Sequence, residues 1–138
     1  MLELNRISAG YGKQTVLDGI SVDFEKGKLT SIIGVNGCGK STLLKAILGI
    51  LSLSNGEIFI DGENLLTISR NEIAKKIAYL SQGKNIPDMT VEQMVLHGRF
   101  PYLSYPRRYS SHDREVAIKA MEIVGVAEFA HKPLYSLS

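Results

Sequence analysis

The sequence predicts an α/β fold, because short apolar strands and amphipathic helices alternate in its first part and helices dominate the remainder. Residues 2–7 alternate apolar and polar side chains, which is typical of a half-buried strand. Residues 41–51 place apolar side chains on one face of a helix. A glycine-rich stretch joins this helix to the apolar segment 29–34. These observations predict a strand–loop–helix unit at the centre of the fold.

Five segments have the length and composition of strands, with glycine-containing turns between several of them. The predicted strands are residues 2–7, 15–25, 29–34, 57–62 and 77–82. Residues 9–12 form a turn, and Asp18-Gly19 interrupts the second strand, which we place at an edge of the sheet. The fourth strand ends in Asp61-Gly62, a dipeptide that favours the tip of a hairpin. Asn55-Gly56 is expected to separate this strand from the preceding helix.

The later helices are predicted mainly from their N-terminal caps. Ser69 with Glu72 and Thr90 with Gln93 have the spacing of capping boxes. Ser110-Ser111 most simply caps the helix that follows a loop rich in proline and tyrosine. The predicted helices end near residues 51, 76, 97, 124 and 131. We therefore expect a nucleotide-binding core over residues 1–85 and an incomplete helical subdomain over residues 86–138.

Composition excludes several classes of protein. Of the 138 residues, 44% are hydrophobic and 22% are charged, which is typical of a folded domain. The net charge of +2 is too small to indicate a nucleic-acid partner. The longest apolar run, LLKAILGILSL, is too short to span a bilayer and contains Lys45, and no signal peptide is recognised. The single cysteine, Cys38, cannot form an internal disulfide, which favours a reducing compartment.

The stretch GVNGCGKST fits the P-loop pattern G-x-x-x-x-G-K-S/T. Backbone N–H groups of such a loop surround phosphates, and Gly34, Gly37 and Gly39 leave room for that approach. The lysine, Lys40, would place its charge on the β- and γ-phosphates, and the Ser41 hydroxyl would bind Mg²⁺. The residues expected to bind the nucleotide in this loop are Asn36, Gly37, Cys38, Gly39, Lys40, Ser41 and Thr42.

The groups that would complete hydrolysis are not found in the sequence. P-loop NTPases usually place a second magnesium ligand, an Asp, at the end of another apolar strand. Here the strand 77–82 ends in Gln82, and Asp61 belongs to the predicted hairpin tip. We therefore expect a P-loop NTPase fold that holds a nucleotide but lacks its acidic magnesium ligand and its base.

The motifs together resemble the nucleotide-binding subunit of ABC transporters, and the resemblance covers the whole chain. It rests on Tyr11 in AGYG, on Val16 five residues later and on the P-loop. The tract LLKAILGILSLSNGEIFIDG and Gln82 in YLSQ continue it. The fold implied is a RecA-like core with an antiparallel β subdomain, truncated after the start of the helical subdomain. The terminal Leu137-Ser138 looks like the beginning of the family signature LSGGQ.

The resemblance implies roles for individual residues. Tyr11 would stack on adenine, Val16 would pack against the nucleotide, and Gln82 would reach Mg²⁺ and the attacking water. Lys40 and Gln82 are thus the expected catalytic residues, and Ser41 and Gln82 the expected metal ligands. The signature core, the acidic strand with its catalytic Glu and the switch His are missing, so the chain looks like the N-terminal portion of a longer ATPase. By itself it would bind nucleotide without turnover.

The same resemblance implies partners and a location. The intact protein would bind ATP and Mg²⁺, dimerise head to tail with a second ATP-binding subunit, and drive an integral membrane permease. It would act in the cytoplasm, peripherally on the inner face of the membrane, and indirectly with a substrate-binding protein. The segment VLHGRFPYL resembles subunits that energise uptake of iron–siderophore complexes, haem or cobalamin. A non-transport ABC-type ATPase and an unrelated P-loop kinase or GTPase are the alternatives; no N-K-x-D base-reading motif supports a GTPase.

Several residues also have simpler interpretations. Tyr11 could be a turn tyrosine and Gln82 a polar strand end. Cys38 is expected to be a small loop residue rather than a redox switch. Arg107-Arg108 is expected to be a solvated part of the loop rather than a contact to lipid headgroups. The three histidines, His97, His112 and His131, lack metal-ligand spacing and are expected at the surface or at helix ends.

Overall fold

The computed structural model describes residues 1–80 and 86–137 and divides the chain into two compact units. The first unit is Met1–Ala78 and the second is Tyr79–Ser138. Each unit has its own buried side chains.

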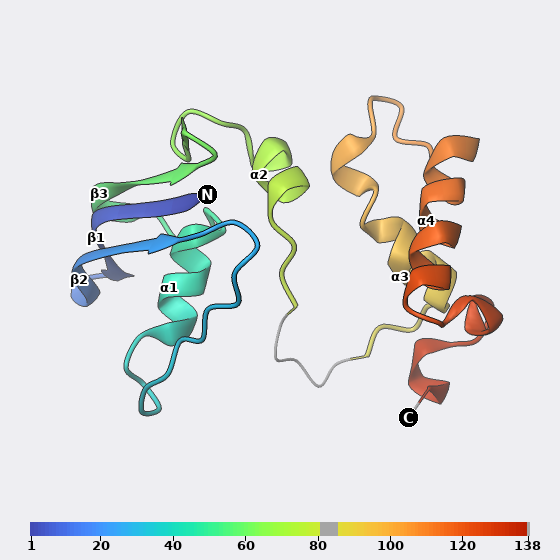
Figure 1. The fold of residues 1–138 in the computed structure, drawn as a ribbon, viewed down its shortest axis with the longest axis horizontal. Coiled ribbons are helices and arrows are strands. Elements are labelled where there is room, and N and C mark those ends of the chain that lie inside the picture. Colours follow the sequence, from blue (N-terminus) through green and yellow to red (C-terminus); the bar gives the residue numbers. More distant parts are fainter. Residues whose placement is uncertain (81–85, 138) are drawn as a thin grey trace. The chain divides into compact units, whose positions relative to one another are not determined.

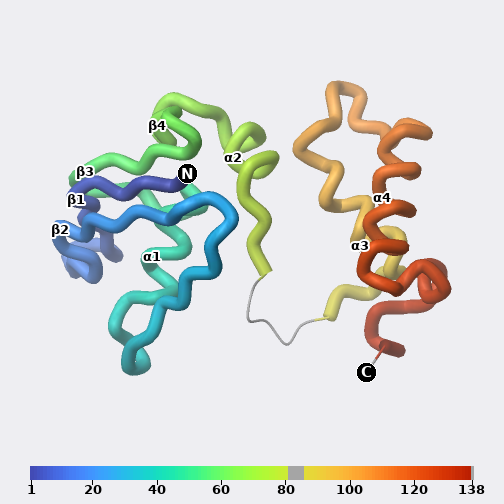
Figure 2. Tube along the Cα trace, viewed as in Figure 1, coloured from blue at the N-terminus to red at the C-terminus, as the bar shows by residue number. Residues whose placement is uncertain are grey.

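The first unit contains one antiparallel sheet. Its strands are β1 (Leu2–Tyr11), β2 (Gln14–Phe24), β3 (Leu53–Ile60) and β4 (Glu63–Asn64), in the order β2-β1-β3-β4. The neighbouring β1, β2 and β3 are drawn as ribbons in Figure 1, and the short β4 is labelled on the tube in Figure 2. The predicted edge position of the second strand and the antiparallel β subdomain are both confirmed.

Two turn predictions had different outcomes. Asp61 and Gly62 both have positive φ, 51° and 81°, and join β3 to β4 as the predicted hairpin tip. Asn55-Gly56, by contrast, does not precede β3 but lies within it. The reason is a register shift between β1 and β3, at which Gly56 has φ of 82°. A Cβ at Gly56 would collide with the carbonyl oxygen of Arg6, so only glycine fits there.

The helix α1 (Lys40–Ile47) covers one face of this sheet (Figure 1). It buries Ala46 and Ile47 against β-strand side chains, among which Leu4, Ile7 and Ile58 are fully buried. The helix was predicted to continue to residue 51 but ends earlier, because Gly49 adopts φ of 65° after the C-cap. A second helix, α2 (Arg70–Lys76), begins at the predicted cap Ser69 and adds Ile73 to the same core.

The second unit is helical. Its elements are α3 (Val91–His97), η1 (Phe100–Tyr102), α4 (Ser111–Ile123), η2 (Ala127–Phe129) and η3 (Leu134–Ser136). The helices α3 and α4 pack together, and the unit buries Val91, Leu96, Ala117 and Met121. The capping box of Thr90 and Gln93 is confirmed, and Ser110 caps α4 as predicted. The predicted helix near residues 126–131 is instead the single turn η2.

A buried carboxylate, Asp113, organises the start of α4. It accepts hydrogen bonds from the Ser110 backbone N–H at 3.0 Å and from the Ser110 hydroxyl at 2.7 Å. It also pairs with the Arg99 guanidinium, with 2.9 Å between Nε and the carboxylate oxygen. The Ser110 hydrogen bonds, and after them the Arg99 side chain, lower the pKa of Asp113 to about 2. The ionised carboxylate therefore ties the loop after α3 to the first turn of α4.

Two predicted strands are not formed in the described residues. Residues 29–34 and residues 77–80 have no regular secondary structure and do not belong to the sheet. Neither segment has a pairing partner among the residues that the structure describes, and a strand is stable only when its backbone groups are paired. Their apolar side chains are consequently exposed, by 98% at Leu29, 91% at Ile33 and 95% at Leu80. None of the helices in the described ranges is long and apolar enough to cross a membrane.

Candidate functional site

The glycine-rich loop makes a turn and then starts α1. Asn36 and Gly37 form the turn, and the Cys38 N–H donates to the Val35 carbonyl oxygen over 3.3 Å. Gly37 and Gly39 have φ of 84° and 99°, which L side chains rarely adopt. Gly39 is the N-cap of α1, so the loop leads directly into a helix N-terminus with unpaired N–H groups. This is the local geometry that binds phosphate groups.

Close packing around the loop explains two of its glycines. A Cβ built at Gly34 would lie 2.6 Å from the Cys38 Sγ. A Cβ built at Gly39 would lie 3.2 Å from side-chain carbons of both Val16 and Leu17. The predicted nucleotide contact Val16 therefore lies directly beside the loop, although it comes from β2. A bulkier residue at Gly34 would displace the Cys38 side chain, and one at Gly39 would press on the side chains of Val16 and Leu17.

Lys40 directs its ammonium group into the loop. Its Nζ donates to the carbonyl oxygens of Gly34 and Val35, each at 2.8 Å, and lies 3.7 Å from the Cys38 Sγ. The next residue, Ser41, is exposed in the first turn of α1. A cationic ammonium, flexible glycines and a helix N-terminus thus meet in one short loop, and this set fits a polyphosphate with an associated cation.

Tyr11 lies at the end of β1 and is half exposed. Its hydroxyl accepts a hydrogen bond from the Lys45 Nζ over 3.3 Å. The Thr42 hydroxyl and then the Lys45 ammonium lower the pKa of Tyr11 below its ordinary value. Both partners belong to α1, so the structure connects Tyr11 to the helix that the P-loop begins.

The structure describes most of the expected site residues, but not all of them. Tyr11, Val16 and the loop residues 36–42 belong to the first unit, and contacts connect Tyr11 and Val16 to α1 or its N-cap. Gln82 lies outside the described residues, as does Ser138. Lys45 was not predicted as a site residue. No signal close to it in the sequence indicates it, because its partner Tyr11 lies 34 positions away.

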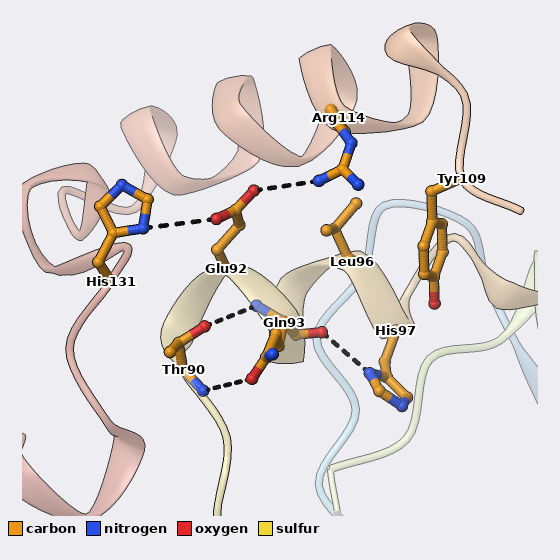
Figure 3. Close-up of a pocket in the computed structure, with 8 residues that line it drawn as sticks. All are labelled: Thr90, Glu92, Gln93, Leu96, His97, Tyr109, Arg114 and His131. Atoms are coloured by element: carbon orange, nitrogen blue, oxygen red, sulfur yellow. Dashed lines mark hydrogen bonds and ion pairs between the residues drawn. The ribbon is translucent and has the colours of Figure 1, made fainter.

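A separate pocket of about 420 Å³ lies in the helical unit (Figure 3). Glu92 lines it and faces the Arg114 guanidinium at 3.5 Å and the His131 Nδ1 at 3.6 Å. His97 bonds the carbonyl oxygen of Gln93 at 2.9 Å in the last turn of α3. His131 is exposed, and in the searched residues no group of three or more His, Cys, Asp and Glu could hold a metal ion.

Comparison with known proteins agrees with this arrangement. The family model for the ABC transporter matches residues 17–138. The petrobactin import ATP-binding protein FpuD of Bacillus anthracis is 36% identical over 99% of the chain and 50% of its own length. The ferric enterobactin transport ATP-binding protein FepC of Escherichia coli (strain K12) is 36% identical over 96% of the chain and 49% of its own length. A solved nucleotide-free ATP-binding cassette from an ABC transporter superposes with a TM-score of 0.85 at 25% identity. That alignment covers 100% of the chain and 59% of the cassette.

The fold and the loop define a P-loop nucleotide-binding protein. More particularly, the chain belongs to the ABC transporter family, in the part that binds the nucleotide. The family match removes the alternative of an unrelated P-loop kinase or GTPase. The chain spans about half the length of the curated relatives that it matches.

Proposed function

We propose that the chain binds ATP with Mg²⁺ at the P-loop and is the nucleotide-binding portion of an ATPase that drives import of an iron complex. The observation that carries the proposal is the Lys40 ammonium at 2.8 Å from two loop carbonyls, at the start of α1. The names of the two relatives support an iron complex as the cargo, since one is named for petrobactin import and the other for ferric enterobactin transport. We therefore propose an iron–siderophore complex as the cargo, in preference to haem or cobalamin.

The geometry around the loop supports the roles proposed for the loop residues, and the family resemblance supplies the roles proposed for Tyr11 and Gln82. The N–H groups of residues 36–42 and the Lys40 ammonium would hold the phosphates, and the exposed Ser41 hydroxyl would bind Mg²⁺. Mg²⁺ would neutralise charge that develops on the phosphates during transfer. Tyr11 would stack on the adenine, and Val16 would close the site from the β2 side. Gln82 is proposed as the residue that reaches the metal and the attacking water.

We propose that the chain as given holds the nucleotide without sustained turnover. Asp61 follows the apolar strand β3 but lies at the tip of the β3–β4 hairpin, and the predicted strand 77–82 ends in Gln82, so neither supplies an acidic magnesium ligand or a base. The test is release of inorganic phosphate from ATP by the purified 138-residue chain. We expect at most a background rate, the same for the chain and for its Lys40→Ala variant. Steady hydrolysis that Lys40→Ala removes would contradict this assignment.

The partners of the complete protein are a permease in the membrane and a second ATP-binding subunit. The family supports both, because the relatives are named as ATP-binding proteins of import or transport, and one solved structure of the same fold is a dimeric ATP-binding cassette bound to ADP and Pi. The complete protein would then act at the cytoplasmic face of the membrane. Affinity purification of the complete protein from detergent-solubilised membranes tests this assignment. We expect a polytopic permease to co-purify, whereas exclusive recovery of ribosomal or DNA-repair proteins would indicate the non-transport alternative.

A further inference from the structure

The contact between Tyr11 and α1 has a consequence for nucleotide binding. The Lys45 Nζ lies 3.3 Å from the Tyr11 hydroxyl but 5.5 Å from the centre of the ring. The ammonium therefore lies beyond the hydroxyl and not over the centre of the aromatic face. A cation in that position holds the end of the side chain without covering the face of the ring.

Thr42 completes the arrangement from the same helix. It is three residues before Lys45, so both side chains lie on one side of α1. Thr42 is buried, with 6% of its surface exposed, and its side chain contributes with Lys45 to the lowered pKa of Tyr11. The hydrogen bond from Lys45 thus ties Tyr11, which comes from β1, to the helix that the P-loop begins.

The hydrogen bond from Lys45 matters because the Tyr11 side chain is otherwise weakly held. The side chain is 49% exposed and comes from the last residue of β1, next to a turn. An exposed tyrosine samples several rotamers, and ordering it on binding costs free energy. Hydrogen bonds that select one rotamer beforehand remove part of that cost.

We propose that Lys45 is a positioning residue for nucleotide binding, which fixes the Tyr11 side chain relative to the P-loop helix so that its ring can receive the base. This inference rests on the proposed function, because it requires that the base of ATP meets Tyr11. Lys45 acts through Tyr11 and contributes to recognition of the base and not of the phosphates.

Two probes separate these contributions. ATP contacts both parts of the site, whereas inorganic tripolyphosphate can contact only the phosphate-binding loop. Isothermal titration of the 138-residue chain with each probe, in the presence of Mg²⁺, is compared for the parent chain, Lys45→Met, Lys45→Arg and Tyr11→Phe. Circular dichroism confirms that each variant keeps the secondary structure of the parent.

We expect Lys45→Met to weaken ATP binding about 3- to 10-fold, the effect of one hydrogen bond, and to leave tripolyphosphate binding unchanged. Lys45→Arg keeps a cationic donor and should restore ATP binding to within about twofold. Tyr11→Phe keeps the ring but loses the acceptor, so it should match Lys45→Met. The double variant Lys45→Met with Tyr11→Phe should bind ATP no more weakly than either single variant, because both substitutions remove the same hydrogen bond.

The outcomes distinguish this inference from the proposed function. Equal weakening of both probes by Lys45→Met would show that Lys45 acts on the phosphates or on the fold, and would overturn the inference. Unchanged ATP binding in Lys45→Met would overturn it as well. If neither probe binds the parent chain, the proposed function itself fails.

Discussion

Replacement of Gly39 by alanine should weaken nucleotide binding more than the same replacement at Gly37. Both glycines have positive φ, 99° and 84°, and an alanine there costs about 1–2 kcal/mol of backbone strain. The two differ in their surroundings. A Cβ at Gly37 has no atom within 4 Å, whereas a Cβ at Gly39 lies 3.2 Å from the side chains of Val16 and Leu17.

The additional contact at Gly39 determines the expected difference in affinity between Gly39→Ala and Gly37→Ala. Contacts of this length require neighbours to move by a few tenths of an ångström, and such overpacking costs about 1 kcal/mol or more. The sum for Gly39→Ala is then about 2–3 kcal/mol. Because a loop that relaxes to relieve this strain must regain its native conformation to hold the phosphates, the affinity should fall by up to roughly 30- to 150-fold. Gly37→Ala should lose only about 5- to 30-fold, since strain is its only cost.

Titration of the chain with a fluorescent ATP analogue measures both variants under the same conditions. Val16→Ala in the Gly39→Ala background provides a further control, because it shortens one of the two side chains that the new methyl group meets. The loss of affinity in this double variant should be smaller than the sum of the losses in the two single variants, Gly39→Ala and Val16→Ala. Equal affinities of Gly39→Ala and Gly37→Ala would refute the reasoning, because the packing of Val16 against the loop would then have no effect.

Three further predictions concern other parts of the chain. The exposed Cys38 lies 3.7 Å from the Lys40 Nζ, so ATP should slow its reaction with a maleimide at least several-fold; an unchanged rate with saturating ATP would argue against nucleotide in this loop. The pKa of Asp113 is lowered from 3.8 to about 2, so its stabilising effect is complete above about pH 4 and is lost as the pH falls toward 2. Thermal unfolding between pH 6 and 2.5 should show this loss for the parent chain, and Asp113→Asn should show a smaller dependence on pH. Leu29 and Ile33 are more than nine-tenths exposed, so the chain should self-associate, and Leu29→Asp with Ile33→Asp should shift it toward monomer in sedimentation velocity. Identical sedimentation of the parent chain and of this double variant would show that residues 29–33 do not cause the self-association.

The parts of the fold predicted correctly depend on local chemistry. The hairpin tip at Asp61-Gly62 follows from the φ values that a short turn demands. The caps at Thr90 and Ser110 follow from hydrogen bonds between residues three apart. The P-loop follows from a fixed spacing of glycines and lysine. Neighbours in the sequence carry the information in each of these cases.

The parts predicted incorrectly depend on distant partners. Residues 29–34 have the composition of a buried strand, but composition does not supply the neighbouring strand that would pair with them. The register shift that places Gly56 inside β3 depends on Arg6, which is far away in the sequence. Lys45 was missed for the same reason, because its partner Tyr11 is separated from it by 34 positions. Tertiary contacts decide these features, and a single sequence does not display them.

The central claim is that the loop from Gly34 to Thr42 binds ATP through the ammonium group of Lys40. Isothermal titration of the 138-residue chain with ATP and Mg²⁺, repeated for Lys40→Ala, tests this claim most directly. Lys40 donates to two loop carbonyls and would also meet the phosphates, so its loss removes charge-assisted hydrogen bonds. We predict saturable binding at one site per chain, reduced at least tenfold in Lys40→Ala. Equal affinities of the two chains, or no binding to a chain with native circular dichroism, would contradict the account.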